Sequence, residues 1–418
     1  MLSFRVDNSD KNASTNYKPK DVERKLIRHV PDLCVFVQHP ASAIPATLKY
    51  DGALLFADIS GFTALTEKYT VSSERGADAL TVTLNDYIGK IVSHILDMGG
   101  DVLKFAGDAI LAVWRVKSRG DLPETVAQAI KSSLIIQQHC DNQETEVGVK
   151  LRVKIAISAG TMFSTFLGNE EIRQFVMTGR PIREVNEAEK FCEAGLVVVS
   201  PNALEFTKDD YVIVESLPGR FGLVKYMCRE PRRTWKDYVT LPDNLEYTDD
   251  QARYERVSMQ IEPDQRREAV IRKYISPVVR QKLDDEQPLK YLSEMRQCSV
   301  VFINLTFVLK ESDRSFQEDQ RNSIQKAFMI IYFVCKELHG AINKIFMFDK
   351  GCTLLVIFGL PGDKHEQEPA HALNAAYKIK QVCIRCRCCY RFDCCSCDFV
   401  AVVYFVYLAV IGVLLTSF

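Results

Sequence analysis

The stretch FADISGFTALTEK, residues 56–68, decides the fold of the first half of the chain. Residues 53–57, which lead into it, form a continuous apolar run, the pattern of a strand buried on both faces. The run ends at Asp58, and a helix begins directly afterwards, from Ser60 to Thr63. Free backbone N–H groups at a helix start, with Gly61 allowing close approach, form a cradle for phosphate. The sequence therefore predicts a strand, a phosphate-binding turn and a helix in direct succession.

A second stretch, LKFAGDAILAVW at residues 103–114, predicts two strands joined by a tight Ala-Gly-Asp turn. Between the two stretches, residues 76–98 carry apolar side chains three or four positions apart, which is typical of an amphipathic helix. Another helix is expected over 123–140 and a strand over 151–159. The order strand, helix, hairpin, helix, strand is that of a ferredoxin-like split βαβ module, so we predict an α+β fold.

The same pattern occurs a second time further along the chain. Residues 298–305 repeat the first strand, 318–338 repeat the helix, and 339–358 repeat the hairpin. Two copies of one module predict a pseudo-symmetric pair with antiparallel sheets and helices.

The two copies differ in their chemistry. Lys344 aligns with Lys104, but Asn304 stands where the first copy has Asp58. No carboxylate aligns with Asp108, although Asp349 lies nearby. Unequal copies suggest a single site, shared at the interface between them.

Asp58 and Asp108 are the candidate catalytic pair. The first strand and the hairpin are neighbours in a ferredoxin-like sheet, so the two carboxylates are expected to converge, and hard divalent cations with substrate phosphates are their natural occupants. Alone, Asp58 is explained as a helix cap and Gly107-Asp108 as a hairpin turn. Together with the phosphate cradle they favour metal-assisted phosphoryl or nucleotidyl transfer, and we expect Lys154 to meet a polyphosphate.

Composition narrows the class of protein. The chain has 418 residues, 53 Lys and Arg against 54 Asp and Glu, and 47% hydrophobic residues, which excludes a disordered or collagen-like protein. A net charge of −1 gives no basic footprint for nucleic acid. The polar N-terminus has no secretory signal, so a cytoplasmic location is expected. Half of the 14 cysteines are scattered between Cys34 and Cys352, as buried core thiols of a reducing compartment are.

We divide the chain into five segments. They are an N-terminal lead (1–40), a metal-binding module (41–226), a charged, proline-rich connector (227–295), a partial second module (296–380), and a Cys-rich, apolar tail (381–418). We expect the connector to pack on the modules and to contain short helices over 265–284.

These motifs resemble the class III nucleotidyl cyclases, most closely the soluble, bicarbonate-responsive adenylyl cyclases. The resemblance covers residues 25–380 and includes HVPDL at 29–33 and INKIFMFDKGC at 342–352. It implies conversion of ATP to 3′,5′-cyclic AMP and pyrophosphate in intracellular signalling, with two divalent cations, Mg²⁺ or alternatively Mn²⁺ or Ca²⁺. A palm-type polymerase shares the module, but the neutral charge and the paired copies disfavour it.

The resemblance also assigns roles to individual residues. Asp58 and Asp108 would be the metal-binding aspartates, with the Ile59 carbonyl as a further ligand. Phosphate contacts are implied for the backbone of Ser60, Gly61, Phe62 and Thr63 and for the side chain of Lys154, and an adenine contact for Lys344.

Two departures from the family pattern bear on function. The family's bicarbonate pocket combines a lysine, here Lys104, with an arginine, at whose position Asn186 stands; Arg183 is expected on another helix face. An uncharged amide does not pair with an anion, so bicarbonate stimulation is expected to be weak or absent. The second copy also stops near Gln381, which predicts that its sheet lacks a strand and that transition-state residues are missing.

The tail and the activity each leave alternatives open. Residues 381–418 are interpreted first as non-native sequence, with a palmitoylated membrane anchor over 399–415 or a soft-metal site as alternatives. The main hypothesis for the chain is an adenylyl cyclase. The alternative is a weak or inactive regulatory paralogue that binds nucleotide or a cyclase partner, and homo- or hetero-association through the modules would supply an intact second copy.

Overall fold

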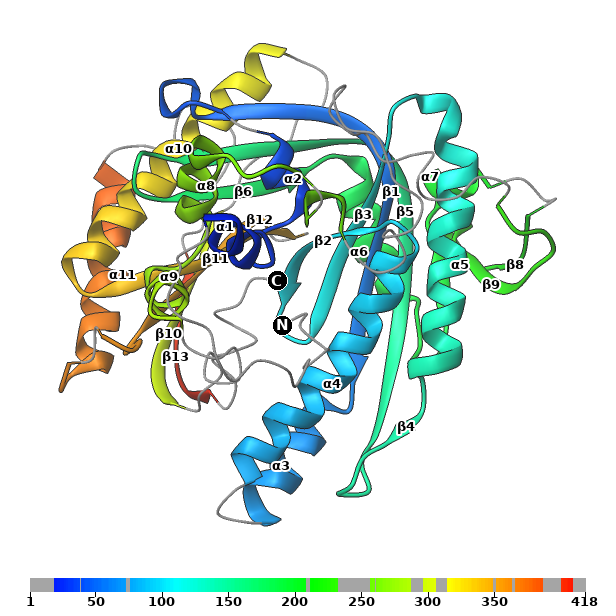
Figure 1. Ribbon diagram of the computed structural model, residues 1–418, viewed down its shortest axis with the longest axis horizontal. Coiled ribbons are helices and arrows are strands. Elements are labelled where there is room, and N and C mark those ends of the chain that lie inside the picture. The colour runs from blue at the N-terminus through cyan, green and yellow to red at the C-terminus, as the bar shows by residue number, and fades with distance from the viewer. Residues whose placement is uncertain are drawn as a thin grey trace.

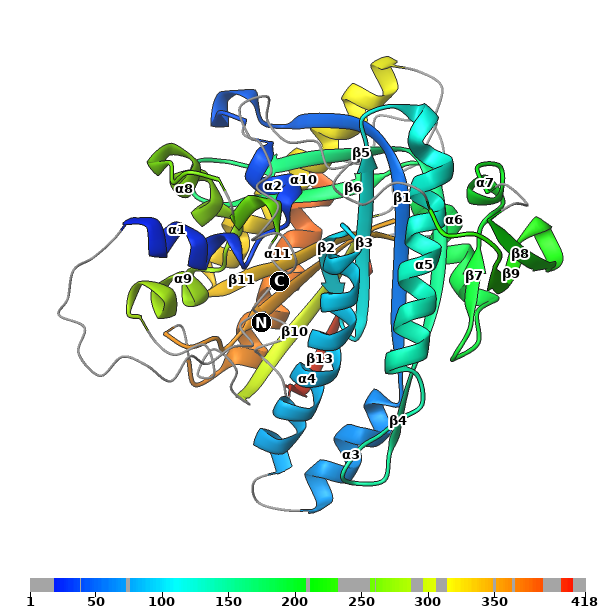
Figure 2. The same cartoon turned by 45° about the vertical axis from the view of Figure 1, so that its right-hand side comes forward.

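The computed structural model describes residues 19–37, 39–72, 76–207, 211–231, 256–259, 261–286, 296–305, 314–348, 351–362, 365–385 and 400–408. These residues form two sheets that lie side by side (Figures 1 and 2). The first sheet belongs to the N-terminal half of the chain. The second, with two helices on one side, is built from residues after 295.

The first module contains the predicted strand, helix and hairpin order. Its central strands are arranged β2-β3-β1-β5, which is the strand order of a ferredoxin-like split βαβ unit. The elements of this unit are β1 (Ala46–Ser60), α3 (Phe62–Ser72), α4 (Gly76–Asp97), β2 (Asp101–Ala106), β3 (Ala109–Val116), α5 (Leu122–Cys140) and β5 (Lys150–Gly168). The α+β prediction is thus confirmed, and β5 is longer than the strand predicted for it.

Further strands extend this sheet beyond β5. Strand β5 pairs with β7 in parallel and with β6 antiparallel, and β9 and β8 continue from β7. The remaining elements of this half of the chain are η1 (Ala41–Ala43), η2 (Arg119–Asp121), β4 (Gln143–Glu144), β6 (Arg173–Thr178), α6 (Arg180–Lys190), β7 (Val197–Val199), α7 (Pro201–Leu204), β8 (Val212–Ser216), η3 (Pro218–Arg220) and β9 (Gly222–Met227).

Strand β1 is buried on both faces, as its unbroken apolar run predicts. Ala53, Leu55 and Ala57 face the core beneath α4 and α5, while Leu54 faces the opposite core, which contains α6. Alternation along a strand sends successive side chains to opposite faces of the sheet. Helices cover both faces here, so the chain does not need a polar face on β1.

The second module repeats the first in the order of its strands. Its sheet runs β11-β12-β10-β13, which corresponds to β2-β3-β1-β5. The elements are β10 (Arg296–Leu305), α10 (Arg314–Glu337), β11 (Gly340–Phe348), β12 (Gly351–Phe358), α11 (Glu368–Arg385) and β13 (Val400–Leu408).

A shared irregularity supports the internal alignment. In the first hairpin the strand register shifts between Val102 and Lys104, and in the second it shifts between Ile342 and Lys344. Beyond the shift, Lys104 pairs with Leu111 and Lys344 with Leu355. A β-bulge re-aims the side chains around it, so both copies present their lysine from the same kind of distortion.

The expectation that the second sheet lacks a strand is wrong. Strand β13 pairs antiparallel with β10 from Val400, opposite Asn304, to Leu408, opposite Arg296. It takes the place that β5 takes beside β1. An uncharged apolar run can be a buried strand as readily as a membrane span, and here β10 supplies its hydrogen-bonding partner. The cysteines after Arg385, Asp349 and residues 409–418 lie outside the described residues.

The connector packs against the first module, as predicted. Its elements are η5 (Val257–Met259), α8 (Gln265–Ile271), η6 (Arg272–Tyr274) and α9 (Pro277–Asp284), and they cover α1 (Pro19–Ile27) and α2 (Asp32–Phe36). Arg256 bonds the carbonyl of Ile27 at 3.0 Å and the Asp32 carboxylate. The N–H groups of Asp32 and Leu33 each donate to Asp101 at 2.9 Å. The lead and the connector are thereby fixed to the start of β2.

Of the seven cysteines between Cys34 and Cys352, six are buried, which agrees with the core role expected for them, and Cys228 is exposed. Within the described residues, no helix combines the length and the apolar character needed to cross a bilayer.

The β5–β6 hairpin of the first module reaches across to α10 of the second. Gln325 on α10 accepts from the Gly168 N–H at 2.9 Å and donates to the Gly168 carbonyl at 2.7 Å. Leu167 and Val176, on the same hairpin, are buried in the core of the second module. One amide thus satisfies both backbone groups of a residue from the other module.

We predict that Gln325→Ala lowers the free energy of unfolding by about 1–3 kcal/mol, because it strands the two backbone groups of Gly168. Asn322→Ala is the matched control, since Asn322 is exposed on the same helix. Urea unfolding of both variants measures the effect. Equal stabilities would contradict the role given to Gln325.

Candidate active site

Asp58 and Asp108 lie on neighbouring strands. Ala57 on β1 is opposite Ile110 on β3, so Asp58 stands beside the turn that contains Asp108. Burial raises the pKa of Asp108, and the negative charge of Asp58 raises that pKa further. The convergence expected for these carboxylates is therefore found, although which ions they hold stays a prediction.

The turn after β1 leads directly into a helix, as predicted, and its role in binding phosphate stays a prediction. Helix α3 begins at Phe62, directly after Gly61, whose φ is +102°. A Cβ at Gly61 would lie 2.8 Å from the Lys150 carbonyl oxygen, so a larger residue does not fit. Phe62 packs its ring on the core, and Thr63 is exposed. Ile59 is buried beside Asp58 and pairs with Val153 on β5.

Lys154 lies directly opposite Asp58 in the β1–β5 register. Its ammonium is 3.0 Å from Asp58 Oδ2 and also contacts the carboxylate of Glu189 on α6. Burial acts to lower the pKa of Lys154, but the bonds from Glu189 and Asp58 outweigh it, so the pKa is raised. Sequence reasoning found Lys154 but missed Glu189, because an acidic residue on a helix carries no signal of its partner.

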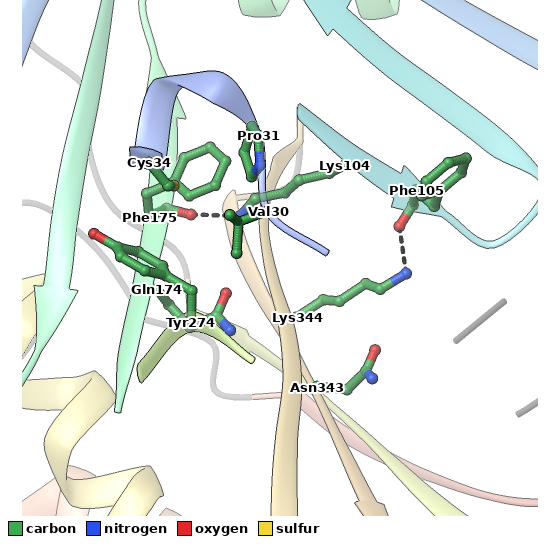
Figure 3. A pocket seen from close by; sticks show the side chains of 10 residues that line it. All are labelled: Val30, Pro31, Cys34, Lys104, Phe105, Gln174, Phe175, Tyr274, Asn343 and Lys344. Carbon is green, nitrogen blue, oxygen red and sulfur yellow. Dashed lines mark hydrogen bonds between the residues drawn. The ribbon is translucent and has the colours of Figure 1, made fainter. Parts of the chain in front are cut away.

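Lys104 and Lys344 each donate a hydrogen bond to a backbone carbonyl of the other module. Figure 3 shows the bond from Lys344 to Phe105, and the bond that Lys104 makes to Phe175 within the first module. Lys104 Nζ donates to the carbonyl of Ile345 at 2.6 Å and to that of Phe175. Lys344 Nζ donates to the carbonyl of Phe105 at 2.9 Å. Each lysine therefore bonds the residue that follows the other lysine, which is the relation a pseudo-twofold axis requires.

Both lysines are removed from water. Burial lowers the pKa of Lys104 to about 7, and burial together with the charge of Lys104 lowers the pKa of Lys344 to about 7. An ammonium in such surroundings needs hydrogen-bond acceptors, and the backbone carbonyls provide them.

Lys104 and Asn186 both line a small cavity of about 30 Å³. The remaining wall, which includes Phe56, Met177 and Phe346, is apolar. Arg183 is exposed on the other side of α6 and does not line this cavity, as predicted. The lysine and the amide expected to share a pocket are thus brought together, and the wall contributes one cationic side chain.

The donor set of Asp58 and Asp108 fits hard divalent cations. Mg²⁺ is usually held by one or two carboxylates plus substrate phosphates rather than by a complete protein cage. The described residues contain no group of three or more His, Cys, Asp or Glu side chains suited to a metal. Two carboxylates beside the start of a helix therefore match a cation that arrives with a polyphosphate.

Comparison with known proteins identifies the class to which this fold and site belong. Residues 46–222 match the family model described as the adenylate and guanylate cyclase catalytic domain. Residues 46–222 are therefore a class III nucleotidyl cyclase domain, and this segment contains Asp58, Asp108 and the turn from Ser60 to Thr63.

The chain is also similar in sequence to curated adenylate cyclases of mammals. The chain is 36% identical over 365 residues to adenylate cyclase type 10 of Mus musculus and, over the same length, to that of Homo sapiens. Each alignment covers 86% of this chain and 22% of the relative, so the chain spans about a fifth of the length of these proteins. A fungal guanylyl cyclase domain from Blastocladiella emersonii superposes with a TM-score of 0.37 and 18% identity, over 44% of this chain and 99% of that one.

We predict that Lys344→Met changes the pH dependence of stability. The folded-state pKa lies below the unfolded value near 10.4, so from about pH 7 to pH 10 the unfolded chain binds more protons and the cost of burying the charge falls as pH rises. The stability of the variant minus that of the parent should fall over this range, by at most about 1.4 kcal/mol per pH unit. Chemical unfolding at several pH values measures it, and a constant difference would contradict the prediction.

Proposed function

We propose that this chain converts ATP to 3′,5′-cyclic AMP and pyrophosphate, using two divalent cations with Mg²⁺ as the first choice. One observation carries the proposal. Lys344 of the second module, the candidate for the base contact, bonds the carbonyl of Phe105 in the first module. Phe105 lies three residues before Asp108, a candidate metal ligand. Both halves of a nucleotide site are thereby drawn to one interface.

The proposed roles follow the chemistry of each residue. Asp58 and Asp108, with the Ile59 carbonyl, would hold the cations, which supply Lewis-acid activation of the 3′-hydroxyl and offset phosphate charge. The N–H groups from Ser60 to Thr63 would orient the phosphates, because a helix start attracts anions.

Two lysines complete the proposed site. Lys154, already beside Asp58, would contact the polyphosphate. Lys344 would leave the Phe105 carbonyl and bond the adenine. The new bond joins O3′ to the α-phosphorus, the bond from that phosphorus to the pyrophosphate oxygen breaks, and the hydroxyl proton leaves to solvent.

The division of labour between modules is part of the proposal. Residues 41–226 would provide the cations and the phosphate cradle, and the module that starts at 296 would provide the base contact. Asn304 and Val400 form the pair in the second module that corresponds to Asp58 and Lys154 in the first. That pair carries no charge, so one catalytic site rather than two is expected.

The first test is cyclic AMP production by the full chain with Mg²⁺, Mn²⁺ or Ca²⁺. We expect metal-dependent product, and we expect Asp58→Asn/Asp108→Asn to lower the rate at least about 100-fold, since it removes the transition-state electrostatics. Asp78→Asn/Asp86→Asn makes the same charge change at exposed positions on α4 and should retain activity. Metal-dependent ATP binding without product would favour a regulatory nucleotide-binding paralogue instead.

We also propose that bicarbonate has little effect on the parent chain. Lys104 already serves two carbonyls, and Asn186 adds no positive charge to their cavity. Cyclic AMP production should be the same with bicarbonate as with chloride at equal pH and ionic strength. Asn186→Arg should gain stimulation, because a second cation in the apolar cavity favours an anion. Strong stimulation of the parent would contradict this.

A further inference from the structure

The ammonium of Lys154 lies between two carboxylates that come from different elements. Asp58 on β1 is 3.0 Å away, and Glu189 on α6 makes the second contact. The three side chains are 24%, 25% and 23% exposed for Asp58, Glu189 and Lys154, so water screens them only in part. Charges shielded in this way interact more strongly than charges on the open surface.

Helix α6 holds Glu189 firmly in this position. Ala188, the residue before it, is fully buried, and so is Val185 one turn earlier. In the middle of the helix, Glu184 accepts from the Asn202 N–H at 2.9 Å. The carboxylate of Glu189 is therefore presented to Lys154 by a helix that is packed into the core, rather than by a loop.

The local charges do not balance. Asp58, Asp108 and Glu189 are all acidic, and Lys154 bonds two of the three. Without metal, Lys154 occupies the same Asp58 carboxylate that a cation would need. Any cation that binds Asp58 must therefore compete with this ammonium. Its affinity depends on whether the ammonium has another carboxylate to bond.

We propose that Glu189 is the positioning residue that retains Lys154 when a divalent cation takes over Asp58. This inference rests on the metal site of the proposed function and adds a regulator of its affinity. Lys154 releases one carboxylate but keeps the other, so the cation does not have to strip the ammonium of every anionic partner. The side chain also stays beside the site, where a polyphosphate can reach it.

Two single variants move cation affinity in opposite directions. Lys154→Met removes the competitor, so the affinity of Asp58 for a cation should rise. Glu189→Gln removes the alternative partner, so Lys154 should hold Asp58 more tightly and the affinity should fall. Glu189 acts through Lys154, and its effect should therefore disappear in the double variant.

The experiment is Mn²⁺ binding to the full chain without nucleotide, followed by electron paramagnetic resonance at fixed pH. We expect binding about fivefold tighter for Lys154→Met and about fivefold weaker for Glu189→Gln. Lys154→Met/Glu189→Gln should bind as Lys154→Met does. Glu215→Gln is the matched control, because Glu215 bonds Lys225 on the strands β8 and β9 and should leave Mn²⁺ binding unchanged.

The double variant separates a positioning role for Glu189 from direct attraction of the cation. If Glu189 attracted the cation directly, its removal would weaken binding in the Lys154→Met background as well, and this would overturn the proposal. Unchanged binding by Glu189→Gln would overturn it too, while the cyclase activity would stand. A parent chain that binds no Mn²⁺ without nucleotide would overturn this inference, and the same titration with ATP present would show whether the metal site of the proposed function stands. Thermal melts confirm that each variant is folded.

Discussion

Two buried lysines, Lys104 and Lys344, cross between the hairpins and bond each other's strand. Each ammonium is buried and needs acceptors, and the backbone carbonyls of Ile345 and Phe105 supply them. A β-bulge at the same place in both strands gives each copy this geometry. The exchange fixes the second module against the strand that leads to Asp108, and the candidate site depends on that alignment.

Burying two ammonium groups at one interface costs free energy, and this cost has a consequence for function. Two cationic groups are kept out of water at one interface, and each lowers its cost only through its carbonyl partners. A nucleotide base that offers a better acceptor to Lys344 would compete with the Phe105 carbonyl. In the proposed function, the base would take the place of the Phe105 carbonyl on Lys344. In the first module, Lys154 bonds Asp58 and Glu189 in the same way before a ligand binds. Both halves of the site are occupied by the chain's own cations before any ligand arrives.

Much of this could be predicted from sequence, because the signals are periodic or local. The run at 53–57 predicted a strand buried on both faces, and the repeat predicted matched hairpins down to the alignment of Lys104 with Lys344. Strand β13 was missed because an uncharged apolar run has no periodicity to separate a strand from a membrane span. Glu189 and the exchange between the lysines were missed because they join elements distant in sequence, and a lysine or glutamate gives no indication of its partner.

In the proposed function, one nucleotide lies between the modules, with the cations held by the first module and the base by the second module. A crystal structure of the full chain with Mn²⁺ and a non-cyclisable ATP analogue tests it most directly. We expect Mn²⁺ at Asp58 and Asp108, with Lys154 on Glu189 or the phosphates, and the adenine bonded by Lys344 in place of the Phe105 carbonyl. A nucleotide bound within one module, with Lys344 still on Phe105, would contradict it.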